Sequence, residues 1–253
     1  MAAGYPFCIK TPSNPPPRSE QGERYILHVQ FHGTDKNQHT KDYEKLERTL
    51  LTEYLKEGIE GNFHEKLMKV TFNITPTQDA NSHCERTLER GIHCFQRVYH
   101  FLGHTETQLK KKCCYLMAAP HEEIHNLLAK FGDFLCERDV EKRARKIGML
   151  LSPLNISLPL DRTQYKIEPD EEHGFFRSYT FTEGCGFMSP EFSTEVQENL
   201  TIDYRPSVVH VRFRGVEGTL VLKEDLEDVK VQFHQSMQKF STRDDNIDRK
   251  SVV

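Results

Sequence analysis

Residues 184–191 read Gly-Cys-Gly-Phe-Met-Ser-Pro-Glu, and this stretch decides the fold of the second half of the chain. The glycines on either side of Cys185 predict a tight turn, because glycine adopts backbone angles that other residues avoid. Ser189, Pro190 and Glu191 predict a helix start, with a serine cap, a proline in the first turn and a carboxylate at the positive end of the dipole. We therefore expect a tight turn and, a few residues later, a helix.

Short extended segments surround this stretch. In residues 209–213, apolar side chains alternate with His210 and Arg212, which is the pattern of a half-buried strand. Gly215 and Gly218 are expected to bound a turn after it. The candidate strands are residues 178–182, 209–213, 219–222 and 229–233. Residues 153–240 are therefore predicted to form a β-rich part.

The preceding part mixes helices and strands. Tyr43, Leu46, Leu50 and Tyr54 recur at helical spacing and predict a helix that ends near Gly58. The other expected elements are strands at 25–31 and 69–74, a helix between Pro120 and Gly132, and a helix with Val140, Ala144, Ile147 and Leu151 on its apolar face. We expect an α+β fold whose two parts meet near residues 153–160.

Composition excludes some classes of protein. The chain has 253 residues, 36% of them hydrophobic, and a net charge of −4. It has no run of about 20 apolar residues, so a transmembrane helix is not expected. Seven irregularly spaced cysteines and no signal-peptide core favour reduced thiols in the cytosol or nucleus. Residues 1–24 are predicted to be a disordered Pro-rich tail, and residues 241–253 a polar end.

Several phrases, in order over roughly residues 70–240, resemble the core of the cell-encoded RNA-dependent RNA polymerases of eukaryotic RNA silencing. They are Ile74–Thr77, Phe101–Thr105, Cys114–Met117, Phe131–Phe134, Lys142–Ala144, Gly184–Gly186, Met188–Pro190, Tyr204–Val209, Val211–Phe213 and Ser236–Phe240. The resemblance implies that residues 25–152 are a mixed N-terminal part of the polymerase core. It also implies that residues 153–240 form part of the first of two double-psi β-barrels.

The resemblance implies an enzyme that copies RNA templates into complementary RNA. Nucleotidyl transfer needs clustered carboxylates that hold two Mg²⁺ ions. In the family an Asp-x-Asp-Gly-Asp loop of the second barrel supplies them, and we expect that loop beyond Val253. No two aspartates stand two positions apart here, and Asp244–Asp248 reads as a solvated acidic tail. We expect no catalytic residue or metal ligand in this chain and no activity from it alone.

The resemblance also implies partners and binding residues. The partners are a single-stranded RNA template and nucleoside triphosphates, with no membrane. Arg212 and Lys239 match positions that contact phosphates in the family, and Arg guanidinium and Lys ammonium groups both suit phosphate. Arg205 and Arg214 border the same strand and are further candidates, as are Lys142 and Arg143 on the basic face of a predicted helix, which is otherwise an ordinary solvated face.

Three departures from the family pattern leave alternatives open. Glu217 stands where a lysine is usual, His234 stands where an arginine is usual, and the stretch after Thr77 is short. The alternatives to a polymerase fragment are therefore a non-catalytic RNA-binding product and a non-functional truncated copy.

Two cysteine-based functions are not expected. The pairs His83-Cys84 and His93-Cys94 have spacing that zinc sites rarely use. Cys185 has no activating base at a motif distance, so we expect a small buried thiol there.

Overall fold

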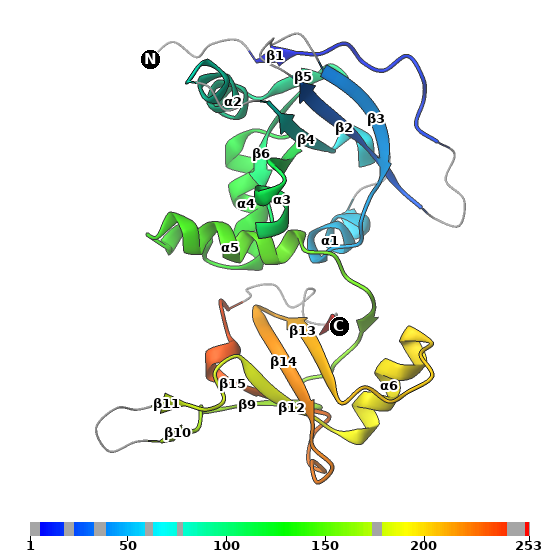
Figure 1. Cartoon of the computed structure of the whole chain (residues 1–253), viewed down its shortest axis with the longest axis vertical. Coiled ribbons are helices and arrows are strands. Elements are labelled where there is room, and N and C mark those ends of the chain that lie inside the picture. The colour runs from blue at the N-terminus through cyan, green and yellow to red at the C-terminus, as the bar shows by residue number, and fades with distance from the viewer. Residues whose placement is uncertain are drawn as a thin grey trace. The chain divides into compact units, whose positions relative to one another are not determined.

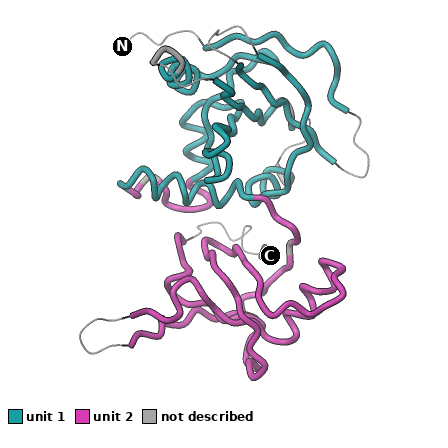
Figure 2. The backbone as a smooth tube through the Cα atoms, viewed as in Figure 1, with its two compact units in different colours: residues 1–128, 138–152 teal, residues 129–137, 153–253 magenta. Residues whose placement is uncertain are grey.

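The computed structural model of the chain describes residues 6–17, 23–32, 39–58, 63–74, 78–173, 179–241 and 251–252. The chain forms two compact units (Figure 2). Unit 1 comprises Met1–Leu128 and Arg138–Ser152, and unit 2 comprises Ala129–Glu137 and Pro153–Val253. The chain therefore passes between the units three times. The last passage adjoins the boundary expected near residues 153–160.

Unit 1 is built on a mixed sheet with helices beside it (Figure 1). The sheet has seven strands in the order β1-β5-β6-β7-β4-β2-β3. The strands are β1 Phe7–Cys8, β2 Tyr25–His32, β3 His39–Lys45, β4 Leu67–Asn73, β5 Ile92–Cys94, β6 Arg97–Gly103 and β7 Cys113–Met117. β1 is parallel to β5 and β2 is parallel to β4, whereas the other neighbours are antiparallel. Leu27, Val29 and Phe31 of β2 are buried on one face, as the strand predicted there requires.

The helical segments of unit 1 are α1 Leu50–Gly58, η1 Phe63–Glu65, α2 Gln78–Arg90, α3 Glu106–Lys110, α4 His121–Phe131, whose last residues pass into unit 2, and α5 Val140–Leu151. Of these, α4 and α5 lie where the sequence predicts helices. The helix expected between Pro120 and Gly132 is α4, and that prediction is confirmed.

The burial of α5 differs from the expected apolar face. Asp139 caps this helix, and its Oδ1 accepts hydrogen bonds from the backbone N–H groups of Glu141 at 2.9 Å and Lys142 at 3.2 Å. Val140 is 66% exposed, whereas Gly148–Leu151 are all buried. The predicted helix is α5, and Leu151 is buried and Ala144 and Ile147 are partly buried, as expected of its apolar face. The prediction is wrong only for Val140, which lies in the exposed first turn.

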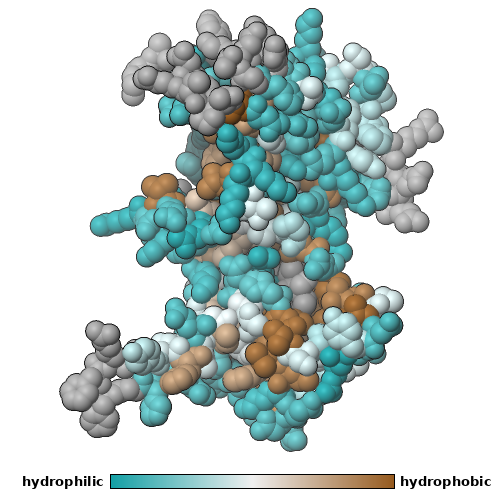
Figure 3. Space-filling view, in the orientation of Figure 1, coloured by the Kyte–Doolittle hydropathy of each residue, from teal (hydrophilic) through white to brown (hydrophobic). Residues whose placement is uncertain are grey.

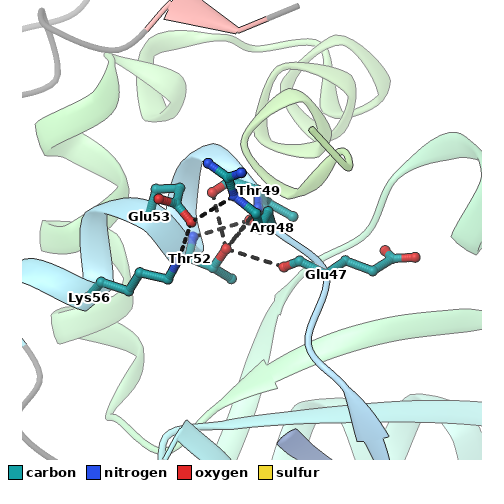
Figure 4. A network of polar contacts seen from close by, with 6 residues as sticks. All are labelled: Glu47, Arg48, Thr49, Thr52, Glu53 and Lys56. Carbon is teal, nitrogen blue, oxygen red and sulfur yellow. Dashed lines mark hydrogen bonds and ion pairs between the residues drawn. The ribbon is translucent and has the colours of Figure 1, made fainter. Parts of the chain in front are cut away.

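The helix predicted from Tyr43 begins later. Tyr43 lies in β3, where it pairs with Leu27, so the prediction is wrong for Tyr43 and Leu46. α1 starts after Thr49, whose Oγ1 accepts from Thr52 N–H at 3.1 Å while Thr52 Oγ1 accepts from Thr49 N–H at 2.8 Å (Figure 4). These reciprocal hydrogen bonds satisfy backbone donors at the helix start, which fixes where the helix begins.

Both ends of the chain carry short strands where the sequence predicts none. In the Pro-rich tail, β1 follows β5: Phe7 N–H donates to Gly91 O at 2.9 Å and Ile9 N–H donates to His93 O at 3.0 Å. In the polar end, β16 Ser251–Val252 pairs with β13 and β8 of unit 2. Both strands form through backbone pairing with distant residues, and such pairing leaves no local pattern in the sequence.

Unit 2 contains a second seven-stranded mixed sheet, with order β8-β16-β13-β14-β12-β15-β9, and a separate pair β10-β11. Its elements are η2 Phe134–Cys136, β8 Ser157–Leu158, β9 Tyr165–Glu168, β10 Glu172–His173, β11 Tyr179–Thr180, β12 Cys185–Met188, α6 Pro190–Leu200, β13 Val208–Phe213, β14 Val216–Leu222, β15 Val231–His234, η3 Gln235–Met237 and β16. β12 is parallel to β14 and β15 is parallel to β9, whereas β12–β15 and β13–β14 are antiparallel.

The core of unit 2 lies between this sheet and α6. Met188, Leu220 and Phe233 are at most 1% exposed, and Phe192 and Val196 of α6 pack onto them. Ser189 caps α6, with Phe192 N–H donating to its Oγ at 3.2 Å, which confirms the predicted helix start. The predicted α+β class is confirmed, with a curled mixed sheet in the β-rich part. Among the helices that the structure describes, none is long and apolar enough to cross a membrane.

The Gly-Cys-Gly turn uses its two glycines for different reasons. Gly184 has φ +69°, the left-handed region expected of a turn glycine. Gly186 has no such angle; instead, a Cβ there would lie 2.4 Å from the carbonyl oxygen of Gln232 on β15. Gly218 lies within β14, where a Cβ would be 2.3 Å from Gly184 O, so it does not bound a turn as predicted. Close backbone approach is what excludes side chains at Gly186 and Gly218.

Candidate nucleic-acid interface

The β13–β14 hairpin positions the predicted strand arginine. Arg214 and Gly215 form its two-residue turn with φ of 47° and 81°, so both lie in the left-handed region. Such a turn fits the twist of the strands that it joins and fixes their register. Phe213 therefore pairs with Val216, and Arg212 pairs directly with Glu217.

Arg212 is engaged by this cross-strand neighbour. Its Nε donates to Oε1 of Glu217 at 2.8 Å, and the two side chains are 26% and 27% exposed. Nε2 of His210, on the same face of β13, lies 3.7 Å from the same carboxylate oxygen. Glu217, at the position where the resemblance implies a lysine, therefore carries the carboxylate that Arg212 contacts.

Two more predicted cations lie at the turn of this hairpin. Lys239 N–H donates to Gly215 O at 2.7 Å, which attaches the segment after η3 to the turn. The exposed Lys239 ammonium donates to Ser236 O at 2.6 Å, and the Arg214 guanidinium donates to the hydroxyl of Tyr165 at 2.7 Å. The structure thus brings Arg212, Arg214 and Lys239 together at one hairpin.

The remaining predicted site residues lie elsewhere. Arg205 precedes β13, at the strand end away from the turn, and forms an ion pair with Glu224 at 2.6 Å. Lys142 and Arg143 belong to α5 of unit 1, where Lys142 is exposed and Arg143 is partly buried. Of the predicted set, Arg212 and Arg214 therefore lie on the hairpin, Lys239 lies beside its turn, Arg205 lies elsewhere in the same unit, and Lys142 and Arg143 lie in unit 1.

His234 does not face solvent. It is 1% exposed, and its Nδ1 lies 2.7 Å from the carbonyl oxygen of Cys185. Because a carbonyl only accepts, this nitrogen carries the proton and donates. The buried His234 side chain therefore stabilises the Gly-Cys-Gly turn through a hydrogen bond to its backbone. Cys185 itself is exposed, so the expectation of a buried thiol is wrong.

A carboxylate that sequence reasoning missed supports the same turn. Asp170 accepts hydrogen bonds from Ser236 N–H at 2.7 Å, Ser236 Oγ at 2.6 Å and Thr182 Oγ1 at 2.9 Å. Gly184 N–H in turn donates to Ser236 Oγ at 3.1 Å. Burial raises the pKa of Asp170, but the hydrogen bonds from Ser236 and Thr182 outweigh it and hold that pKa below its usual value. Asp170 and Ser236 are 66 residues apart, so no local pattern points to this network.

Possible metal ligands do not cluster among the residues that the structure describes. The part of the chain that it describes contains no group of three or more His, Cys, Asp or Glu side chains that could hold a metal ion. The acidic segment Asp244–Asp248, like Thr75–Thr77 at the first family phrase, lies outside the described residues. All seven cysteines are free. His83 packs edge-on against Phe7 and Phe31, with ring centroids 5.7 and 5.8 Å away.

Comparisons with known proteins bear on the whole chain. The model of the RNA dependent RNA polymerase family matches residues 18–251. The probable RNA-dependent RNA polymerase SHL2 of Oryza sativa subsp. japonica is 24% identical over 243 residues, which is 90% of this chain and 18% of that protein. RNA-dependent RNA polymerase 1 of Arabidopsis thaliana is 27% identical over 165 residues, which is 64% of this chain and 15% of that protein.

A solved structure shows the same fold. The RNA-dependent RNA polymerase QDE-1 from Thielavia terrestris matches with a TM-score of 0.66 at 13% identity, over 92% of this chain and 28% of that one. The β-rich part of the chain thus resembles the barrel of a polymerase core. The chain spans less than a fifth of the length of the two curated relatives above. Because the family model matches most of its residues, the chain belongs to the RNA-dependent RNA polymerase family.

Proposed function

We propose that this chain is a segment of a polymerase that copies RNA templates into complementary RNA for RNA silencing. Its part in that reaction is to contact the phosphates of the template or of the incoming nucleotide. The observation that carries the proposal is the position of Arg212 and Arg214 on the β13–β14 hairpin and of Lys239 beside its turn, in a chain of this family. Cytosol or nucleus is the compartment that we propose with it.

Lys239 is the residue best placed to bind phosphate. Its side chain is exposed, and an ammonium group has three donor hydrogens, of which the Ser236 carbonyl takes one. Its backbone is fixed to the hairpin turn through Gly215. Lys142 and Arg143 of unit 1 are separate candidates for contacts with an RNA backbone. Such contacts position a nucleic acid without reading its sequence.

Mg²⁺ would supply charge stabilisation for the attacking and leaving oxygens in a family enzyme. The described residues do not fit that ion, because they provide no carboxylate cluster. No catalytic step is therefore placed on the described residues, and the binding role proposed above rests on the cations at the β13–β14 hairpin.

The proposal predicts measurable binding of single-stranded RNA that depends on Lys239. Lys239→Ala should weaken the affinity for a fluorescein-labelled 12-nucleotide oligouridine about 3- to 10-fold. The plot of log K against log salt should become shallower, with the magnitude of its negative slope reduced by about 0.7 for each phosphate that the variant no longer neutralises. Fluorescence anisotropy between 50 and 300 mM KCl would measure both effects.

Lys45→Ala is the matched control, since Lys45 lies on β3 of unit 1 and pairs with Glu23 there. It removes the same charge and should leave the RNA affinity within about twofold. Because an exposed ion pair contributes little to the stability of the fold, this variant should also stay folded. Equal affinity of Lys239→Ala and the parent chain would contradict the assignment of Lys239.

A second candidate is that the chain acts by itself as a non-catalytic RNA-binding protein. Each unit has its own buried hydrophobic core, which favours a product that folds. Nucleotide incorporation on an RNA template with Mg²⁺ distinguishes the two candidates, since a binding protein shows none in any longer form of the chain. A non-functional copy would show neither incorporation nor RNA binding.

A further inference from the structure

Glu217 holds the arginine that the proposed function assigns to phosphate. The side-chain carboxylate accepts from Nε of Arg212 at 2.8 Å, and the pair is only about a quarter exposed. Nε belongs to one of the edges with which a guanidinium grips an oxyanion through two parallel hydrogen bonds. A phosphate that approaches this edge meets a carboxylate already bound there.

We propose that Glu217 is an intramolecular competitor of phosphate, and that it sets the RNA affinity of this hairpin by occupying Arg212. The inference rests on the proposed function, because it presupposes that the hairpin meets RNA. It identifies a residue that lowers affinity, whereas the residues above raise it.

The hairpin geometry makes the competition persistent. Arg214 and Gly215 form a two-residue turn, so the register that places Arg212 opposite Glu217 cannot slip without breaking the hairpin. The turn is itself held by Lys239 N–H through Gly215 O. A carboxylate tethered in this way stays next to the guanidinium at high effective concentration, whatever the RNA concentration.

The expected size of the effect is moderate. The Arg212–Glu217 ion pair should weaken the binding of phosphate by Arg212 no more than about fivefold, because solvent screens an ion pair of this exposure. The carboxylate also repels the phosphate directly, at a distance below the Debye length. Together these effects predict a change of about 3- to 10-fold in RNA affinity.

The experiment uses the full 253-residue chain and a fluorescein-labelled 12-nucleotide oligouridine. Glu217→Gln should bind about 3- to 10-fold more tightly than the parent chain. Its salt slope should steepen by about 0.7, since one more phosphate is neutralised. Glu217→Lys should bind more tightly still, because it adds a cation beside Arg212.

Glu198→Gln is the matched control, since Glu198 is exposed on α6 of the same unit and the substitution makes the same change in net charge. It should change the affinity less than twofold. The gain from Glu217→Gln should be smaller when Arg212→Gln, Glu217→Gln is compared with Arg212→Gln alone, because only the direct repulsion of phosphate is then relieved. This cycle separates release of Arg212 from a general change in charge. Circular dichroism melting confirms that each variant is folded.

The outcomes are distinct. Tighter binding by Glu217→Gln that becomes smaller without Arg212 supports the inference. Binding by the parent chain that Glu217→Gln does not change, or a gain that the loss of Arg212 does not reduce, overturns it and leaves the proposed function standing. No binding by the parent chain or any folded variant overturns both.

Discussion

At the scale of single residues, Glu44 shows how a partly exposed carboxylate can stabilise unit 1. It accepts from Nδ1 of His28 at 2.8 Å and also pairs with Lys69. The other ring nitrogen of His28 lies 2.8 Å from Oγ1 of Thr71, so the ring is held from both sides. The hydrogen bond from His28, together with Lys69 and against the effect of burial, lowers the pKa of Glu44 to about 2.

This shift predicts a pH dependence of the free energy of unfolding. The pKa of Glu44 falls from 4.5 in the unfolded chain to about 2 in the folded one. The stabilisation is therefore fully present above about pH 4.5 and is lost as the pH falls towards 2. Glu44→Gln should lower the free energy of unfolding at pH 7 by about 1–2 kcal/mol, after allowance for solvent screening.

Urea titrations at pH 7 and pH 3 measure this effect. The difference between Glu44→Gln and the parent chain should be smaller at pH 3. Glu47→Gln is the control, because Glu47 is exposed and its backbone carbonyl, not its carboxylate, accepts the hydrogen bond from Thr52. A difference that stays constant between the two pH values would show that Glu44 acts through packing.

At the scale of elements, the close packing of β12 with its neighbours determines which glycines tolerate change. Gly186→Ala would place a Cβ 2.4 Å from a backbone carbonyl oxygen of β15, which cannot move without shifting the strand. We expect it to lower the free energy of unfolding by at least about 3 kcal/mol. Gly184→Ala meets nothing within 4 Å and should cost only the left-handed strain, about 1 kcal/mol.

Chemical denaturation of the two variants, monitored by circular dichroism, compares these costs directly. The pair is well matched, since both substitutions add one methyl group and are two residues apart. Equal costs would mean that backbone angle, and not close approach, is what the motif needs.

Some elements could be predicted from the sequence because their signals are local. α4 has Pro120 before it and Gly132 after it, and β13 alternates clearly between buried and exposed residues. β3 could not, because His39–Lys45 is a mostly polar strand at the edge of its sheet, so its alternation is hidden. α2 carries few apolar residues, and nothing in its sequence marks it as a helix.

The candidate site was predictable in part for the same reason. Arg212 and Lys239 are predicted from family phrases, and the structure places Arg212 on β13 and Lys239 beside the turn after that strand. The pairing of Arg212 with Glu217 could have been read from the sequence, since a two-residue turn at Arg214-Gly215 places residues 212 and 217 opposite each other. The buried His234 could not, because its partner is the backbone carbonyl of Cys185, 49 residues away.

At the scale of the whole molecule, the hydrophobic surface of unit 2 is notable. Val208 and Val221 are 56% and 38% exposed and pair across β13 and β14. Figure 3 shows hydrophobic side chains over these strands, among hydrophilic surface. They lie on the face that also carries Arg212 and Glu217, since alternate residues of a strand share a face.

Residues 129–137 belong to unit 2, although they precede the last segment of unit 1 in the sequence. Phe134 is 2% exposed and its ring meets that of Phe240 edge-on, with centroids 4.8 Å apart. Phe134→Ala should therefore destabilise unit 2 by about 3–5 kcal/mol, although this residue precedes Pro153. Amide hydrogen exchange of β13–β15 measures the effect, and Val140→Ala, at an exposed site, should leave exchange unchanged. Faster exchange confined to unit 1 would contradict the division into units.

The interleaved connection has a consequence for biosynthesis. Phe134 leaves the ribosome before α5 does, yet its partner Phe240 follows about 100 residues later. At about 5–20 residues per second, this apolar segment waits on the order of 5–20 s for its partner. During that interval α5 can complete unit 1 while the segment stays uncovered. The nascent chain therefore passes through a stage in which a chaperone that recognises short aromatic segments would find one to bind.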